Sequence, residues 1–139
     1  MKVRDLMTSH ICCVSPDITI ENASKLMRGA DIGVVPVCDN GGIVGIVTDR
    51  DIITRGISKG FGPTEKVEKI MTRNVISVAP DADVKDAVKI MGDRQVRRLP
   101  VVMGKEIVGI ISVGDIARCG KLDNEVAKAE CGIAEMYKM

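Results

Sequence analysis

The sequence is nearly free of aromatic residues and holds a single histidine. Among its 139 residues there is no Trp, one Tyr and one Phe. A hydrophobic core must therefore be built from Val, Ile, Leu, Ala and Met, which is typical of short buried strands covered by helices. One histidine, His10, and the lack of a phosphate-binding loop pattern oppose catalysis, so we expect no enzyme.

The chain also lacks an excess of either charge and any long apolar run. Twenty basic residues against nineteen acidic ones oppose a nucleic-acid-binding module, although they do not exclude a local basic patch. No run approaches the roughly 20 apolar residues of a membrane span. The charged start, MKVRDLMTSHICC, lacks the apolar centre of a signal peptide. We therefore expect a cytoplasmic protein without a membrane partner.

Cysteines are few and match no disulfide framework. The five, at positions 12, 13, 38, 119 and 131, are an odd number without a Cys-x-x-Cys pair, so reduced thiols are expected. Cys13 and Cys38 are predicted to lie on strands of one unit and could be neighbours. Three hypotheses stay open: a zinc site with His10 and Cys12, a reversible disulfide, or plain packing. Packing is the commonest role of free cysteine, and we expect no metal.

What the sequence does contain is an internal repeat. Sliding the chain by 64 residues places Val3–Ile52 on Val67–Ile116 without a gap, and 17 of these 50 positions are identical. We therefore divide the chain into a first repeat at 1–58, a linker at 59–66, a second repeat at 67–120 and a C-terminal extension at 121–139. Glycine and proline mark the linker.

The sequence pattern of each repeat predicts secondary-structure elements in the order β-α-β-β-α. An apolar stretch ends in Pro-Asp, a turn signal, and Thr19 or Asp83 just beyond it is a candidate helix N-cap. Two β-branched runs follow, joined in a hairpin by Asn-Gly-Gly at 40–42 or Gly-Lys at 104–105, and a helix begins after each pair. The predicted fold is α/β. Because about 50 residues bury little surface alone, the repeats are expected to pack about a pseudo-twofold axis.

The C-terminal extension carries one apolar stripe at helical spacing, formed by Leu122, Val126, Ala129, Ile133 and Met136. The stripe predicts a helix that packs on its own chain or, alternatively, a helix that pairs with a second copy. Two heptads rarely hold two chains together by themselves.

The two repeats resemble a tandem pair of CBS domains, named after cystathionine beta-synthase and together called a Bateman module. Both copies carry the pattern MT…V.PD…A…M…PV…VGI, followed by Thr or Ser three residues before Asp, and the resemblance covers residues 3–116. Stand-alone bacterial and archaeal members are most similar. The resemblance implies a non-catalytic regulatory module that binds AMP, ADP, ATP or a related adenosyl ligand in the cleft between the repeats. It also implies a homodimer, a downstream protein partner and no further cofactor.

A hydroxyl and a carboxylate recur where each repeat passes from strand to helix, as Thr48-x-x-Asp51 and Ser112-x-x-Asp115. An ionised Asp only accepts hydrogen bonds, so it can hold both hydroxyls of a ribose. The helix N-terminus beside it suits phosphate. The alternative is a capping box, in which the same groups bind the backbone of their own helix. One pair of residues can serve both purposes.

Arg97 and Arg98 are candidate phosphate ligands, because a guanidinium group can give a phosphate two parallel hydrogen bonds. Adjacent strand residues point to opposite faces, so at most one of them aims into a given pocket. The alternative is a solvated charged edge. The first repeat has Gly33 and Val34 at these positions, so the two sites cannot be equivalent.

The family resemblance implies two composite sites. The first joins one corner to residues at the second repeat: Thr48, Asp51, Val75, Ile76, Arg97, Arg98 and Pro100. The second joins the other corner to residues of the first repeat: Ser112, Asp115, Ile11, Cys12, Val34 and Pro36. Because only the first site has arginines, we expect it to bind AMP, ADP or ATP more tightly. The alternatives are a protein-interaction or redox-responsive scaffold with degenerate sites, and a nucleic-acid-binding module.

Overall fold

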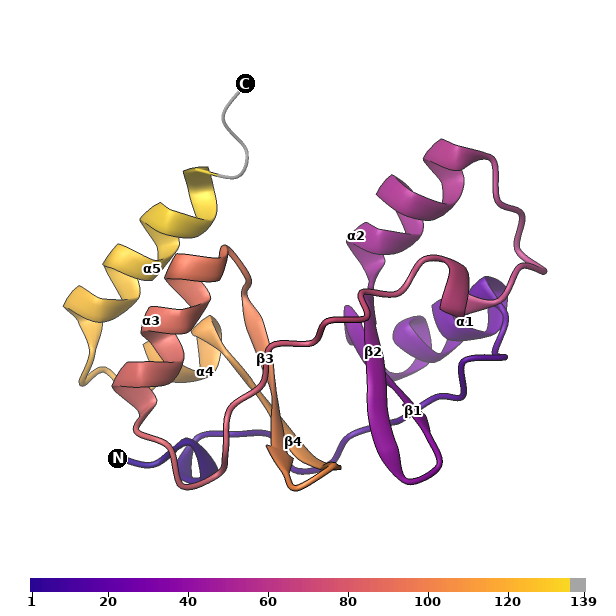
Figure 1. The fold of residues 1–139 in the computed structure, drawn as a ribbon. Coiled ribbons are helices and arrows are strands. Elements are labelled where there is room, and N and C mark those ends of the chain that lie inside the picture. Colours follow the sequence, from indigo (N-terminus) through magenta and orange to yellow (C-terminus); the bar gives the residue numbers. More distant parts are fainter. Residues whose placement is uncertain (136–139) are drawn as a thin grey trace. The chain divides into compact units, whose positions relative to one another are not determined.

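The computed structural model describes residues 1–135 and divides the chain into two units. The first unit is Cys12–Val75, and the second unit is made of Met1–Ile11 together with the chain from Ile76 onward. Each unit has a two-stranded antiparallel sheet with helices, so the predicted α/β class is confirmed (Figure 1). The pseudo-twofold arrangement stays a prediction. Within the described residues, no helix is both long enough and apolar enough to cross a membrane.

The helices and strands follow the predicted order, apart from the first strand of each repeat. The first unit has α1 (Ile20–Ala30), β1 (Val34–Asp39), β2 (Gly42–Thr48) and α2 (Asp49–Asp51), which continues as a π-helical turn at Ile52–Gly56. The second unit has α3 (Val84–Arg94), β3 (Arg98–Met103), β4 (Glu106–Ser112), α4 (Val113–Arg118) and α5 (Asp123–Glu135). Thr19 and Asp83 cap α1 and α3, as predicted, by accepting hydrogen bonds from backbone N–H groups.

Both predicted hairpins form, with β1 antiparallel to β2 and β3 antiparallel to β4. The Asn-Gly turn at 40–41 has positive φ at both residues, 52° and 78°, which is the geometry that this dipeptide favours in a tight hairpin. The register places Val34 opposite Thr48 and Arg98 opposite Ser112. The start of each hairpin therefore lies beside the corner at which its second strand ends.

The predicted first strand of each repeat is reduced to one bridging residue. Val14 pairs in parallel with Val37 alone. Its N–H donates to the Pro36 carbonyl at 3.0 Å, and its own carbonyl accepts from the Cys38 N–H at 2.9 Å. A longer ladder would need N–H groups from Pro16 and Pro36, and proline has none. Prolines 80 and 100 limit the equivalent bridge of the second repeat in the same way.

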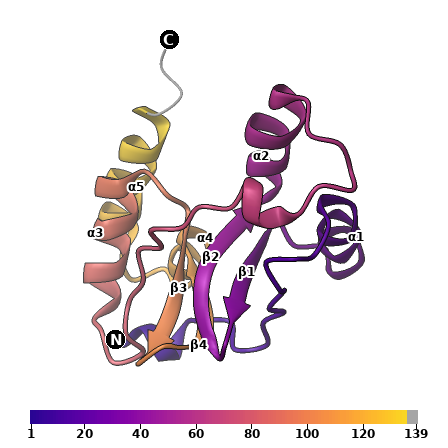
Figure 2. The ribbon, with the colours of Figure 1, turned by 45° about the vertical axis from the view of Figure 1, so that its right-hand side comes forward.

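The segment that leads each repeat belongs to the unit of the other repeat. Thr72 and Ile46 exchange two backbone hydrogen bonds of 2.9 and 3.0 Å in the first unit. Thr8 and Ile110 exchange two of 2.8 and 3.0 Å in the second unit, where the N-terminal segment runs beside β4 (Figures 1 and 2). The units in space therefore combine residues of both repeats.

These contacts explain several residues that are identical in the two repeats. A Cβ atom at Gly45 would lie 2.6 Å from the Met71 sulfur and 3.0 Å from the Thr72 carbonyl oxygen. At Gly109 it would lie 2.6 Å and 2.9 Å from the same atoms of the Met-Thr pair at 7–8. Only glycine lets the Met-Thr segment lie this close to the strand.

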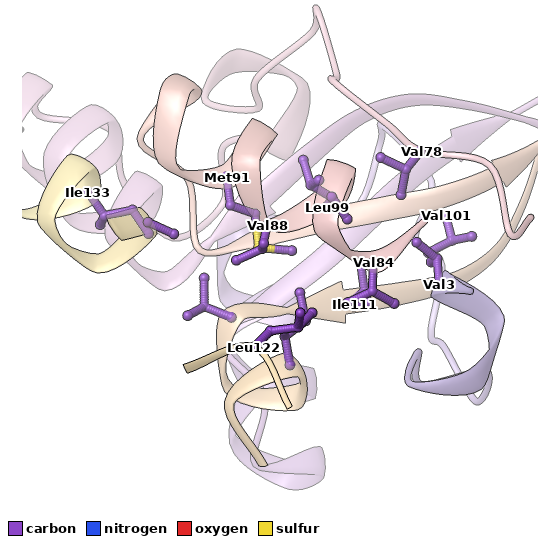
Figure 3. Packing of buried hydrophobic residues seen from close by; sticks show 14 residues of the cluster. Val3, Val78, Val84, Val88, Met91, Leu99, Val101, Ile111, Leu122 and Ile133 are labelled. Carbon is purple, nitrogen blue, oxygen red and sulfur yellow. The ribbon is translucent and has the colours of Figure 1, made fainter. Parts of the chain in front are cut away.

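Each unit has its own hydrophobic core. In the second unit, β3, β4, α3, α4 and α5 surround aliphatic side chains (Figure 3). Ala129 and Ile133 of α5 are part of this core, as is Leu122 directly before the helix, which confirms the helix predicted to pack on its own chain; Met136 lies outside the described residues. The core of the first unit gathers side chains of α1, β1, β2 and the segment at 67–71, and Phe61 of the predicted linker packs against it.

Candidate functional site

The two strand-to-helix corners form the same capping box. At the first corner the Asp51 N–H donates to the Thr48 hydroxyl oxygen at 3.1 Å, and the Thr48 N–H donates to Asp51 Oδ2 at 2.9 Å. At the second corner the Asp115 N–H donates to the Ser112 hydroxyl oxygen at 3.0 Å, and the Ser112 N–H donates to Asp115 Oδ2 at 2.9 Å. The capping alternative is therefore confirmed at both corners.

Capping occupies only part of each corner. The box uses one carboxylate oxygen, Oδ2, and each aspartate is half-buried, with 14% of the Asp115 side chain exposed. An ionised carboxylate has about four lone-pair positions, so one backbone N–H leaves capacity for further donors. A corner of this kind can accept hydrogen bonds from the hydroxyls of a bound molecule while it still caps its helix.

A neighbouring arginine distinguishes the second corner from the first. The Arg118 guanidinium, on the last residue of α4, donates to Asp115 Oδ1. The matching residue of the first repeat is Thr54, whose hydroxyl donates instead to the Arg50 carbonyl at 2.9 Å. Asp115 Oδ1 therefore already accepts from a cation, whereas Thr54 offers Asp51 no such ion pair.

The two candidate phosphate ligands differ in their surroundings. Arg98 is the first residue of β3 and is half-buried, whereas Arg97 precedes the strand and is exposed. The Arg97 guanidinium donates to Glu130 on α5 at 3.1 Å, and each of the two side chains is about half exposed. An exposed ion pair of this kind stabilises by no more than about 1 kcal/mol. A phosphate could therefore replace Glu130 at little energetic cost.

In the first repeat an acidic side chain lies where the second repeat has Arg97. A Cβ atom at Gly33 would lie 2.8 Å from Asp49 Oδ2, so the Asp49 carboxylate fills the space beside Gly33. The matching pair in the second repeat is Arg97 and Val113. The charged side chain beside the start of the hairpin is therefore acidic in the first unit and basic in the second.

The predicted apolar site residues are divided between the units. Val34, Pro36 and Pro100 are buried in their hairpins. Val75, Ile76 and Ile11 are half-buried, and Cys12 is exposed. The first unit holds Thr48, Asp51, Val75, Cys12, Val34 and Pro36, and the second holds Ile76, Arg97, Arg98, Pro100, Ser112, Asp115 and Ile11. Their grouping into two composite sites stays a prediction.

Two of the cysteines named in the three hypotheses meet in the first unit. Cys13 and Cys38 are neighbours, as predicted, with their sulfur atoms 3.1 Å apart. His10 belongs to the other unit. Within residues 1–135 no three His, Cys, Asp or Glu side chains are close enough together to hold a metal ion. Cys13 and Cys38 therefore form a pair of thiols, and the zinc hypothesis stays untested.

Sequence reasoning missed three charged neighbours and one motif. Arg118 and Glu130 contact predicted site residues, and Asp49 lies beside Gly33, the residue before Val34. Comparing the two repeats position by position would have singled out Asp49 and Arg118. The sequence Gly-Ile-Ser-Lys-Gly at 56–60, where the first repeat passes into the linker, also has the spacing of a hydrolase nucleophile elbow. Here, however, Ser58 lies in a 3₁₀ turn after a π-helical turn, not between strand and helix, and its hydroxyl donates to the Thr54 carbonyl.

Comparison with known proteins gives consistent matches. The model of the CBS domain family matches residues 3–57 and again residues 67–121. The CBS domain-containing protein YhcV of Bacillus subtilis is 37% identical over 125 residues, which cover 90% of this chain and 89% of that protein.

Two solved structures are similar to this chain in fold. The CBS domain pair of protein MJ0100, in complex with 5′-methylthioadenosine and S-adenosyl-L-methionine, matches with a TM-score of 0.80 at 30% identity and covers 86% of this chain and 95% of that one. Hypoxic Response Protein I, crystallised with two coordinated zinc ions, matches with a TM-score of 0.78 at 33% identity and covers 85% of this chain and 98% of that one.

Proposed function

Because the chain belongs to the CBS domain family, as a tandem pair of these domains, we propose that it is a non-catalytic regulatory protein that binds an adenine nucleotide. Pairs of this family are regulatory modules, and the MJ0100 pair binds adenosyl ligands. The observation that carries the proposal is the duplicated corner, in which a half-buried aspartate caps its helix with one oxygen.

The chemistry of the corner suits the sugar of a nucleoside. The two hydroxyls of a ribose are donors on adjacent carbons, and a carboxylate can accept both. A hydrogen bond to a charged acceptor contributes about 1.5 to 3 kcal/mol. Asp51 is the better candidate, because Arg118 already donates to Asp115. The Asp51 corner is therefore proposed as the principal ribose-binding position.

The charges beside the hairpins favour different ligands for the two predicted sites. Arg97 and Arg98, grouped with Asp51 by the family resemblance, supply positive charge for a phosphate tail. The second predicted site groups Asp115 with Val34 and Pro36. The residue before Val34 is Gly33, and the Asp49 carboxylate beside Gly33 repels phosphate. We therefore propose that AMP, ADP or ATP prefers the first site, and that the second takes an uncharged adenosyl ligand or stays empty.

A melting experiment tests this proposal. The wild-type chain is heated alone and with ATP, AMP or adenosine, since a specific ligand at 100 times its dissociation constant stabilises by about 2.7 kcal/mol. ATP and AMP are expected to raise the Tm. The Arg97→Ala/Arg98→Ala variant is expected to lose most of that shift but to keep any shift with adenosine.

The matched control removes two charges elsewhere in the same unit. Lys85 and Lys89 are exposed on α3, so Lys85→Ala/Lys89→Ala should respond to ATP like the wild type. If no adenosyl ligand changes the Tm, the proposed function is wrong and a scaffold with degenerate sites is favoured. If the double arginine variant binds ATP normally, the assignment of the phosphate ligands is wrong.

Regulation needs a ligand that binds two arrangements of the protein unequally. We propose that these arrangements belong to a homodimer that acts on a further protein. Twofold dimers are the commonest assemblies of soluble proteins. Ile53 and Ile57, which lie four residues apart after α2, are 60% and 67% exposed, and such side chains suit a contact with a second copy.

A further inference from the structure

The thiols of Cys13 and Cys38 meet at the edge of the first unit. The Cys38 thiol donates to the Cys13 sulfur at 3.1 Å. The backbone fixes this contact, because the Cys38 N–H donates to the carbonyl of Val14, the residue next to Cys13. A disulfide has its sulfur atoms about 2.05 Å apart, so a movement of about 1 Å would join them.

The fold itself does not require this pair. The matching positions of the second repeat hold Ser77 and Val102, and the second unit forms the same single-residue bridge at Val78 without any thiol. The bridge between these segments therefore forms without a thiol at either position, and the second unit has no matching pair that could be oxidised.

The two sulfur atoms also differ in accessibility. Cys13 is exposed, whereas Cys38 is half-buried. Burial, followed by the hydrogen bond and the charge repulsion between the two thiols, raises the pKa of Cys38 to about 12. Cys38 is thus kept as a protonated thiol beside an accessible one. This arrangement separates an attacking cysteine from a resolving cysteine.

We propose that Cys13 and Cys38 form a reversible intramolecular disulfide, which makes the first unit a thiol–disulfide exchange site for small disulfides such as oxidised glutathione. The Cys13 thiolate attacks one sulfur of the small disulfide, the bond between its two sulfurs breaks, and one small thiol leaves. Cys38 then loses its proton and attacks the Cys13 sulfur, and the second small thiol leaves. The protein loses two hydrogens and two electrons, and the small disulfide gains both.

The order of these steps follows from the surroundings of the thiols. Once Cys13 carries the small thiol, it can no longer become a thiolate, so its charge repulsion no longer raises the pKa of Cys38. Burial of Cys38 remains. The first step thus makes the second thiol easier to ionise at the moment when its attack is needed.

The test equilibrates the full-length reduced chain with mixtures of reduced and oxidised glutathione and reads out intact mass, free thiols and peptide maps. The wild type is expected to lose two thiols and two hydrogens and to yield a Cys13–Cys38 linked peptide that a reductant separates. Cys38→Ser should stop at the first step and keep one glutathione on Cys13. Cys13→Ser should react at Cys38 at least about tenfold more slowly than Cys38→Ser reacts at Cys13.

Cys12→Ser is the matched control, because it removes the exposed thiol next to Cys13 and should still form the linked peptide. Three results would overturn the proposal: wild-type protein that keeps glutathione on Cys13, a disulfide that joins two chains, or a linked peptide through Cys12. All three are measured without nucleotide, so they are independent of the proposed function.

Discussion

The hydroxyls of Thr48 and Ser112 each accept a hydrogen bond from the backbone of the aspartate three residues later. The spacing of these residues and their duplication made both corners predictable from the sequence. The contacts of the predicted phosphate ligand Arg97 were not predictable in the same way. Arg97 reaches Glu130, which is 33 residues away on α5, and only the packing of α5 on its unit creates that contact.

Thr48→Ala removes the hydroxyl that caps α2. The loss of an N-cap costs about 1 kcal/mol, so we expect the free energy of unfolding to fall by that amount in urea titrations. Thr19→Ala removes the cap of α1 and should cost about as much. A Thr48→Ala variant as stable as the wild type would mean that the capping box contributes nothing to folding.

Ionisation of Cys38 makes the stability of the reduced protein depend on pH in the alkaline range. Its pKa rises from 9.0 to about 12 on folding, mainly because of burial. Between these pH values the folded chain binds more protons than the unfolded chain, so this contribution to stability is complete below pH 9 and is lost as the pH rises toward 12. Only thiolates are alkylated.

We therefore expect iodoacetamide at about pH 8 to label the exposed thiols of Cys12, Cys13 and Cys131 before Cys38. The rate at Cys38 should still increase above pH 9. Peptide mapping by mass spectrometry measures each site separately. Equal rates at Cys13 and Cys38 near neutral pH would contradict the raised pKa.

The secondary elements were largely predictable, but their lengths and contacts were less so. Helix caps, hairpin turns and the apolar stripe at 122–136 are local patterns, and each appears as expected within the described residues. The predicted first strand is shortened because Pro16 and Pro36 lack the N–H groups of a longer ladder. The position of each Met-Thr segment depends on the path of the whole chain, which no local pattern records.

Gly109→Ala tests the close contact between a Met-Thr segment and a strand. The added Cβ atom would lie 2.9 Å from the Thr8 carbonyl oxygen, and a backbone atom cannot easily move away. Overpacking of this kind costs about 1 to 3 kcal/mol, measured as a loss of unfolding free energy.

Gly29→Ala is the matched control, because its Cβ atom meets nothing within 4 Å and lies in α1. Alanine in a helix is more stable than glycine by about 0.5 to 1 kcal/mol, so this variant should gain stability. Equal effects of the two substitutions would show that the strand does not require glycine at position 109.

For the whole molecule, the internal repeat was the decisive sequence signal. It predicted two α/β units of the CBS family, and the family model and the structure confirm both. The repeat boundaries do not describe the units in space, because each leading segment belongs to the unit of the other repeat. A duplication reports common ancestry of two segments, whereas packing decides which segments share a core.

The proposed homodimer is tested by charges placed on its expected interface. Ile53→Lys/Ile57→Lys places two charges where a second copy is expected to cover apolar surface, so the variant should sediment as a monomer. Met103→Lys is the matched control, because Met103 is 62% exposed on β3 and should not affect assembly. Wild-type protein that stays monomeric at high concentration would contradict the dimer.

Calorimetric titration of AMP into the wild type, Asp51→Asn and Thr19→Ala tests whether the Asp51 carboxylate binds the ribose. Asparagine keeps the shape of the corner but replaces a charged acceptor with a neutral amide, and a lost charged hydrogen bond weakens binding about ten- to hundredfold. Thr19→Ala weakens a helix cap of the same unit but should bind AMP like the wild type. We expect tight binding of AMP to the wild type and to Thr19→Ala, and weaker binding to Asp51→Asn. Equal AMP affinity in all three proteins would show that Asp51 does not bind the nucleotide.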